Sequence, residues 1–86
     1  MPTLSRFHGI TIQMYWDDRH GPHFHAYYGE HEALISILDG SYLAGKLPRR
    51  SERLALRWLE LNRAALLENW RRAQNREPFI KIEGLK

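Results

Sequence analysis

The sequence contains no cysteine, and this absence removes several classes of protein at once. Disulfide bonds, zinc fingers built on cysteine and catalysis by a thiol nucleophile are all excluded. A bound metal ion would have to be held by histidine and carboxylate side chains.

Long apolar runs are also missing, since no stretch approaches the roughly 18 residues that a membrane-spanning helix requires. Residues 1–16 have neither the charged start nor the apolar block of a signal peptide. We therefore expect a cytoplasmic protein with no membrane contact. The motifs of phosphate-binding loops, dinucleotide-binding folds, serine hydrolases and zinc proteases are absent as well.

The chain has 86 residues, of which 43% are apolar and 27% charged, which is the balance of one soluble globular domain spanning residues 1–86. A chain this short buries only about 60–65% of its unfolded surface, so a monomer would be marginally stable. We therefore expect a homodimer.

Charge is unevenly distributed along the chain. Residues 1–45 hold two basic and five acidic side chains together with all five histidines, whereas residues 46–86 hold eleven basic against five acidic. This asymmetry favours an anionic partner for the second half. The alternative is that the basic residues serve solubility alone.

Alternating apolar residues predict strands at residues 10–16 and 23–29, antiparallel to each other, with an exposed loop at 17–22. Residues 33–38 read as a third strand, and Asp39-Gly40 is typical of a two-residue type I′ hairpin. Counting outward from this turn pairs Leu38 with Ser41, Ile37 with Tyr42 and Ile35 with Ala44. A fourth strand would then run to about Lys46.

A helical period follows from Pro48 to about Asn75, with roughly half of the circumference apolar. One helix of about 24 residues would be about 36 Å long, which allows its outer part, around Trp70, to extend to a second subunit. Residues 79–82 favour a short edge strand. The predicted fold is α+β: a four-stranded antiparallel meander, one long C-terminal helix packed on it and a short final strand.

Two histidines at spacing two, His23 and His25, are expected on the same face of one strand with their imidazoles within about 8 Å. Three interpretations remain open. The pair could bind a divalent transition metal with His20, Asp17 or Asp18 as third ligand. It could act as a catalytic acid and base, or it could be polar filler on a solvent-facing surface. We expect no other cofactor.

Basic residues gather at the expected helix start: Lys46, Arg49, Arg50, Arg53 and Arg57. Positive charge in a first helical turn opposes the macrodipole, at a cost of roughly 0.3–1 kcal/mol per charge, unless an anion is bound. Free N–H groups beside two arginines would suit a phosphate or carboxylate. The alternatives are ion pairs with Asp39, Glu30 or Glu32, and plain solvation.

Aromatic residues on the expected sheet face add to this hypothesis. Tyr15, Tyr27 and His25 share one side of the sheet, and exposed aromatics near basic residues often stack the bases of single-stranded nucleic acid. We therefore name RNA or DNA as the anionic partner, with Tyr27 added to the basic residues of the site.

Several stretches together resemble one family, the prokaryotic domain of unknown function 4160. They are Met-Pro-Thr-Leu-Ser-Arg-Phe at residues 1–7, Ile-x-Met-Tyr at 12–15, Gly-Pro-His-Phe-His-Ala at 21–26, Tyr-Gly-Glu at 28–30, Gly-Lys-Leu-Pro-Arg-Arg at 45–50 and Leu-Leu-Glu-Asn-Trp at 66–70. The family motif has Pro-Pro where this chain has Gly21-Pro22. Both histidines are kept.

The resemblance implies a bacterial protein whose gene often stands beside one encoding domain of unknown function 2442, in an arrangement like that of toxin–antitoxin pairs. The leading hypothesis is a component of such a two-gene system that binds RNA or DNA. A second is a ribonuclease-like toxin in which His23 and His25 share acid and base roles, with Arg49 or Arg50 stabilising the phosphorane. A third is a non-enzymatic module for dimerisation or for docking the neighbouring gene product. The sequence does not decide whether the protein is an enzyme.

Overall fold

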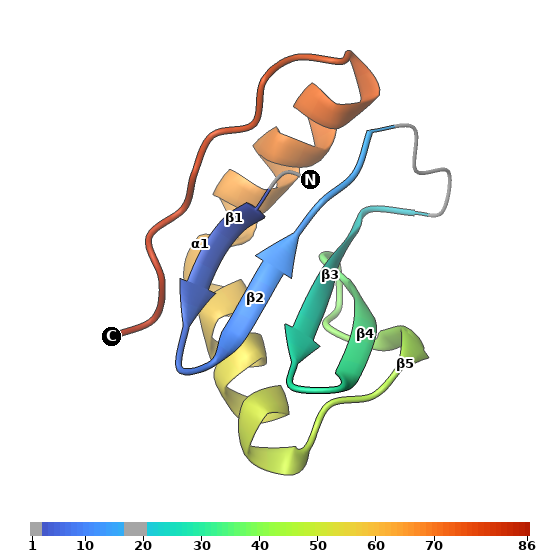
Figure 1. Ribbon diagram of the computed structural model, residues 1–86. Helices are drawn as coiled ribbons and strands as arrows, with labels where there is room; N and C mark the ends of the chain where they lie inside the picture. Colours follow the sequence, from blue (N-terminus) through green and yellow to red (C-terminus); the bar gives the residue numbers. More distant parts are fainter. Residues whose placement is uncertain (1–2, 17–20) are drawn as a thin grey trace.

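The computed structural model describes residues 3–16 and 21–86, and within these ranges it contains five strands followed by one long helix (Figure 1). The strands are β1 (Thr3–Phe7), β2 (Ile10–Gln13), β3 (His23–Tyr28), β4 (His31–Ser36) and β5 (Tyr42–Gly45), and the helix α1 spans Arg49–Gln74. Each strand pairs antiparallel with the next one along the chain. The predicted α+β class, with an antiparallel sheet and one long C-terminal helix, is confirmed.

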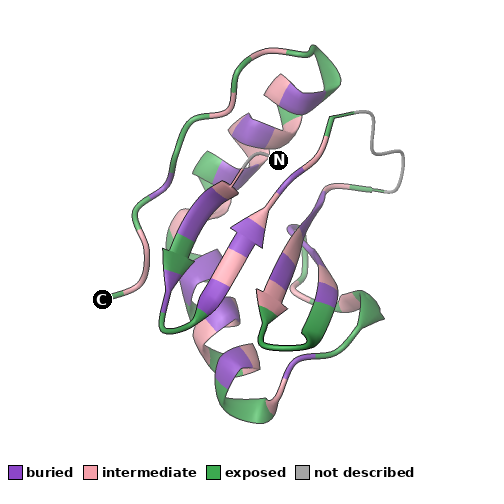
Figure 2. Ribbon diagram, in the orientation of Figure 1, coloured by how far each residue is buried: buried purple, intermediate pink, exposed green. Residues whose placement is uncertain are grey.

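One face of the sheet packs against α1, and the alternation of apolar residues decides which face (Figure 2). Ile10 and Ile12 are fully buried, whereas Thr11 between them is half-buried. Since successive side chains of a strand point to opposite faces, the apolar set faces the helix. The ring of Trp58 on α1 meets Phe24 of β3 edge to face, at 5.9 Å between centroids. The buried apolar residues of α1 are Ala55, Trp58, Leu59, Leu66 and Ala73.

The first strand, β1, is one that the sequence pattern did not predict. Leu4 and Phe7 are both buried although they are three residues apart, because a β-bulge shifts the register of β1 against β2. His8 and Gly9 form the turn to β2, and their φ angles of 48° and 79° are the left-handed pair that a type I′ hairpin requires. The four predicted strands correspond to β2–β5, and β1 extends the meander to five strands among the described residues.

The connection from β4 to β5 is wider than the predicted two-residue turn at Asp39-Gly40. Ile35, rather than Ile37, lies opposite Tyr42. Ile37 leaves the ladder and is fully buried, while the Asp39 carboxylate accepts hydrogen bonds from the N–H and the hydroxyl of Ser41. The predicted register is wrong because burying the Ile37 side chain takes this residue out of strand pairing.

The helix α1 has 26 residues, close to the predicted length, but it is not straight. Asn62 has the non-helical angles φ −125° and ψ 18°, and its side-chain amide donates to the Trp58 carbonyl at 2.9 Å. The helix therefore consists of two segments that meet at Asn62. Among the described residues, no helix is both long and apolar enough to cross a membrane.

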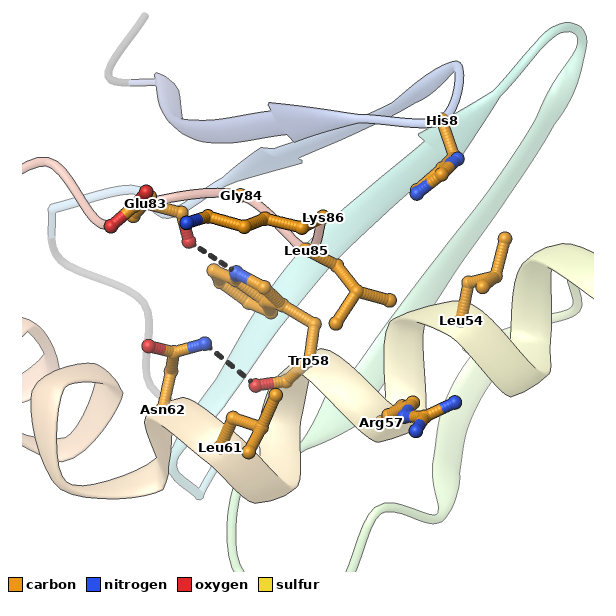
Figure 3. A pocket seen from close by; sticks show the side chains of 10 residues that line it. All are labelled: His8, Leu54, Arg57, Trp58, Leu61, Asn62, Glu83, Gly84, Leu85 and Lys86. Atoms are coloured by element: carbon orange, nitrogen blue, oxygen red, sulfur yellow. Dashed lines mark hydrogen bonds between the residues drawn. The ribbon is translucent and has the colours of Figure 1, made fainter.

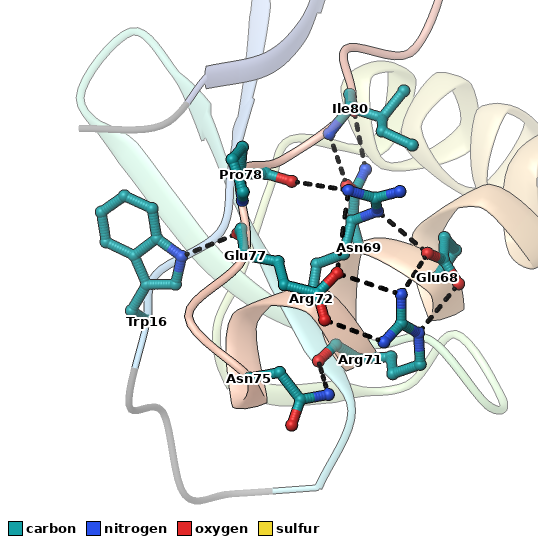
Figure 4. A network of polar contacts seen from close by, with 9 residues as sticks. All are labelled: Trp16, Glu68, Asn69, Arg71, Arg72, Asn75, Glu77, Pro78 and Ile80. Atoms are coloured by element: carbon teal, nitrogen blue, oxygen red, sulfur yellow. Dashed lines mark hydrogen bonds and ion pairs between the residues drawn. The ribbon is translucent and has the colours of Figure 1, made fainter.

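The predicted final strand at residues 79–82 is wrong, although the segment does run beside β1. Its Ile82 N–H donates to the Leu4 carbonyl at 2.9 Å. Both backbone groups of Ile80 are instead bonded to the side-chain amide of the fully buried Asn69, each at 2.8 Å. Because a helix side chain takes the groups that a sheet neighbour would need, the segment stays outside the ladder (Figure 4).

Candidate functional site

Five basic side chains surround the first half of α1, and we call them the basic helix face: Lys46, Arg49, Arg50, Arg53 and Arg57. All five are exposed. Arg49, Arg53 and Arg57 are spaced by four residues and therefore follow one side of the helix. The side chains make no ion pair or hydrogen bond with any part of the chain that the structure describes.

The arginines of the second half of α1 are in the opposite situation. Arg63 pairs with Glu60 at 2.9 Å, and Glu68 is held between Arg71 at 2.7 Å and Arg72 at 2.9 Å (Figure 4). Hydrogen bonds from Arg71 lower the pKa of Glu68 from 4.5 to about 2. Within the described ranges, positive charge is thus neutralised in the second half of the helix and left open in the first.

The carboxylates proposed as ion-pair partners of the basic helix face contact other groups, or form no ion pair within the described residues. The Asp39 carboxylate accepts from Ser41, and this contact holds the Asp39 pKa below its ordinary value. A carboxylate oxygen of Glu32 lies 3.6 Å from Nδ1 of His25. Among residues 3–16 and 21–86, no ion pair joins Asp39, Glu30 or Glu32 to the basic helix face, so the internal-pairing alternative is not supported.

A tyrosine–glutamate contact fixes where the basic helix face begins. The Tyr42 hydroxyl of β5 donates to Glu52 at 2.6 Å and accepts from the Leu47 N–H at 3.1 Å. Burial, and next the bond to Glu52, raise the pKa of Tyr42. Pro48 is the N-cap of α1, one residue before the first helical turn in which the sequence placed it. These contacts hold the start of α1 at the end of the sheet.

A groove of about 510 Å³ adjoins the basic helix face, and we call it the His8 groove (Figure 3). Three segments line it: His8 from the β1–β2 turn, Leu54, Arg57, Trp58, Leu61 and Asn62 from α1, and residues 83–86. The Trp58 indole N–H donates to the Glu83 carbonyl at 2.9 Å, which ties the last segment to the helix. A smaller hollow of about 240 Å³ shares His8 and Leu54 and adds Tyr28, Pro48, Arg50 and Ser51.

The sequence interpretation missed His8, Tyr28 and residues 83–86 as possible site residues. His8 lies in a turn whose strand β1 was itself not predicted. A histidine followed by glycine between two apolar residues was the available signal, because histidine is enriched among non-glycine residues with positive φ. No local pattern indicated that residues 83–86 would lie against α1.

Tyr27 does not lie with the basic helix face as the sequence interpretation assumed. Its neighbour Ala26 faces the helix and is fully buried, so Tyr27 is on the opposite side of the sheet. Its hydroxyl lies 2.8 Å from that of Tyr15, and burial followed by this hydrogen bond raises the pKa of Tyr27. The tyrosine that lines a hollow with Arg50 is Tyr28.

The two histidines of β3 are side by side, as predicted, with 5.4 Å between the centroids of His23 and His25. His23 is fully buried, against the expectation of a solvent-facing surface. Its Nδ1 lies 2.8 Å from the Gly21 carbonyl, and its ring lies 5.2 Å from that of Trp70. The kinked helix thus brings Trp70 onto His23 of the same chain.

Burial of His23 bears on the catalytic interpretation of the pair. A general acid or base must come within hydrogen-bond reach of its substrate, and His23 exposes no surface for this. The metal interpretation relies on loop residues Asp17, Asp18 and His20, which lie outside the described residues. In the described part of the chain there is no group of three or more metal-ligating side chains, and metal binding stays a hypothesis.

The described residues define a class of small α+β protein, in which a five-stranded antiparallel meander is covered on one face by a kinked helix with an open basic start. Residues 9–71 match the family described as Domain of unknown function (DUF4160), and the chain belongs to this family. The resemblance stated from the sequence is confirmed. Neither a curated protein nor a solved structure matches the chain.

Proposed function

We propose that the protein binds RNA or DNA through the basic helix face. One observation supports this proposal above all: Arg49, Arg50, Arg53 and Arg57 are exposed and lack carboxylate partners in the described chain, whereas Arg63, Arg71 and Arg72 are paired. Residues 46–57 hold five basic side chains and one acidic side chain, Glu52. Such a local concentration of positive charge attracts a polyanion even though the whole chain carries only +3.

Helix physics points to the same ligand. Arginines in the first turn raise the energy of the free protein because they lie at the positive end of the macrodipole. A phosphate removes this repulsion and accepts hydrogen bonds from the free N–H groups of the turn as well as from Arg49 and Arg50. The ligand therefore offsets a cost that is built into the free fold.

The genetic setting that the family resemblance implies is part of the proposal. We place the protein in a bacterial two-gene system of the toxin–antitoxin kind, with a protein of domain of unknown function 2442 as its partner. Binding of nucleic acid would suit either member of such a pair. Co-purification of the two gene products from one operon tests this part of the proposal separately.

The binding test uses fluorescence anisotropy with labelled RNA and DNA at several salt concentrations. We expect Arg49→Ala/Arg50→Ala to weaken binding by about 3 kcal/mol, the scale of two charge-assisted hydrogen bonds. The slope of log affinity against log salt should become shallower by roughly 1.4 to 1.8. The melting temperature should stay unchanged or rise slightly, because the removed charges oppose the macrodipole.

A matched control removes the same charge from another surface. Arg6→Ala/Lys81→Ala eliminates two exposed cations near β1, away from the basic helix face. We expect this variant to bind RNA and DNA almost as well as the unchanged protein. Equal loss in both variants, or unchanged affinity in Arg49→Ala/Arg50→Ala, contradicts a site on the basic helix face.

A further inference from the structure

The His8 groove offers aliphatic side chains that a phosphate bound at the basic helix face would not contact. Its lining combines apolar and polar groups, and Leu54, Leu61 and Leu85 contribute the aliphatic side chains. Leu61 is 70% exposed, so its side chain is available to a ligand in this groove. Arg57 and Lys86 add positive charge to the same lining, and Glu83 is its one carboxylate side chain among the described residues.

The groove continues along the helix toward the smaller hollow. His8 and Leu54 belong to both, and the smaller hollow adds Arg50 and the ring of Tyr28. Arg50 and Arg57 are seven residues apart, which is two helical turns and about 10 Å along the axis. We call the two neighbouring hollows together the channel, and Arg50 and Arg57 place cations along it.

Tyr28 offers an aromatic surface in this channel. The residue is 38% exposed, and a Cβ built at Gly9 would lie 3.1 Å from its ring. The β1–β2 turn therefore supports the ring closely. A ring held in this way and still open to solvent loses little conformational entropy when a flat group stacks on it.

We infer that the channel holds unstacked bases of a single-stranded polynucleotide whose phosphates lie on Arg50, Arg53 and Arg57. This inference rests on the proposed function and names its ligand class. In a duplex the bases are stacked inside and only the phosphates would meet the arginines, so the leucines of the channel and the ring of Tyr28 would make no contact with the ligand. A single strand presents flat bases together with phosphates, and it fits both parts of the surface.

The test compares four labelled oligonucleotides of one sequence on the full chain: single-stranded RNA, single-stranded DNA and the two duplexes. We expect either single strand to bind more tightly than its duplex. Tyr28→Ala should weaken single-strand binding at least about fivefold, the lower end for loss of one stacked base, and Tyr28→Phe should keep it. Comparison of the RNA and DNA arms identifies which polynucleotide is the ligand.

A pair of exposed positions tests the groove itself. Leu61→Ser removes apolar surface from the His8 groove, and Ile80→Ser removes a similar side chain, 49% exposed, from outside its lining. We expect only Leu61→Ser to weaken single-strand binding, with duplex binding unchanged.

The outcomes separate the inference from the proposed function. The channel is not a base-binding site if the duplexes bind as tightly as the single strands and if Tyr28→Ala and Leu61→Ser leave the affinity unchanged. If Arg49→Ala/Arg50→Ala still weakens binding in that case, the basic helix face binds nucleic acid without the channel. If the unchanged protein binds none of the four oligonucleotides at low salt, both proposals are overturned.

Discussion

Gly84 is a residue whose small size holds the C-terminal segment against β1. A Cβ at this position would lie 2.7 Å from the Arg6 carbonyl oxygen and 2.9 Å from Cβ of Phe7. Both distances are shorter than atoms of a packed protein tolerate. The segment from Ile82 to Lys86, and with it one wall of the His8 groove, depends on this close approach.

We therefore expect Gly84→Ala to lower the free energy of unfolding by about 1–3 kcal/mol, the usual cost of forcing an atom into a packed site. Urea denaturation followed by tryptophan fluorescence measures it. Gly21→Ala is the matched control, because a Cβ at Gly21 would meet no atom of residues 3–16 or 21–86 within 4 Å. The control should change stability by no more than about 0.5 kcal/mol. Equal effects of the two substitutions would show that the segment does not pack on β1.

At the scale of the element, α1 is one helix with two electrostatic halves. The kink at Asn62 separates an N-terminal half with open arginines from a C-terminal half whose arginines are paired with glutamates. Arg71 and Arg72 lie in the last turn, where positive charge is favourable toward the macrodipole. The second half is therefore arranged for stability, whereas the arginines of the first half have no carboxylate partner in the part of the chain that the structure describes.

Glu68 gives this arrangement a measurable pH dependence. Its pKa is lowered from 4.5 to about 2 by Arg71 and Arg72, so the carboxylate stabilises the folded chain fully above pH 4.5. The contribution is lost as the pH falls through about 2, where the folded protein also binds the proton. We expect Glu68→Gln to be less stable than the unchanged protein at pH 7, with a difference that shrinks from pH 4.5 downward.

Urea denaturation at pH 7, 4.5, 3 and 2 checks this expectation. Glu30→Gln removes the same charge from a side chain that forms no ion pair within the described residues, and it serves as the control. A difference between Glu68→Gln and the unchanged protein that stays constant across this pH range would mean that the arginine contacts do not stabilise the fold.

At the scale of the whole molecule, the two edges of the sheet differ in what lies beside them. The C-terminal segment runs beside β1, whereas β5 forms the other edge (Figure 1). Beside β5, the exposed side chains of Leu38 and Leu43 line a hollow of about 550 Å³ with Leu34 and Ala44. An uncovered strand edge next to apolar surface favours association with another chain.

The homodimer therefore stays a prediction, and the β5 edge is the surface that we expect to form its interface. Light scattering should give twice the chain mass of 10.2 kDa at micromolar concentration. Leu43→Lys, at the β5 edge, should shift the mass toward that of one chain, and Leu61→Lys, on the exposed side of α1, should not. A mass of one chain at every concentration would contradict the prediction.

Much of the candidate site could be predicted from local sequence patterns. The basic helix face could be predicted because Pro48 and the helical period of residues 49–74 place its arginines by sequence spacing alone. The adjacency of His23 and His25 followed from strand alternation in the same way. The His8 groove could not be predicted, since its walls come from residues near both ends of the chain and from the helix between them.

The sequence by itself determined the α+β class, the position of the helix and the sign of its exposed face, because hydrogen bonding within a helix and alternation within a strand are local. Tertiary structure alone decided the rest. Four features differ from the locally favoured arrangement because another arrangement packs better. They are the bulge in β1, the burial of Ile37, the kink at Asn62 and the hydrogen bonds between Asn69 and Ile80. In a chain of 86 residues, such long-range contacts decide where strands end and which surfaces form a groove.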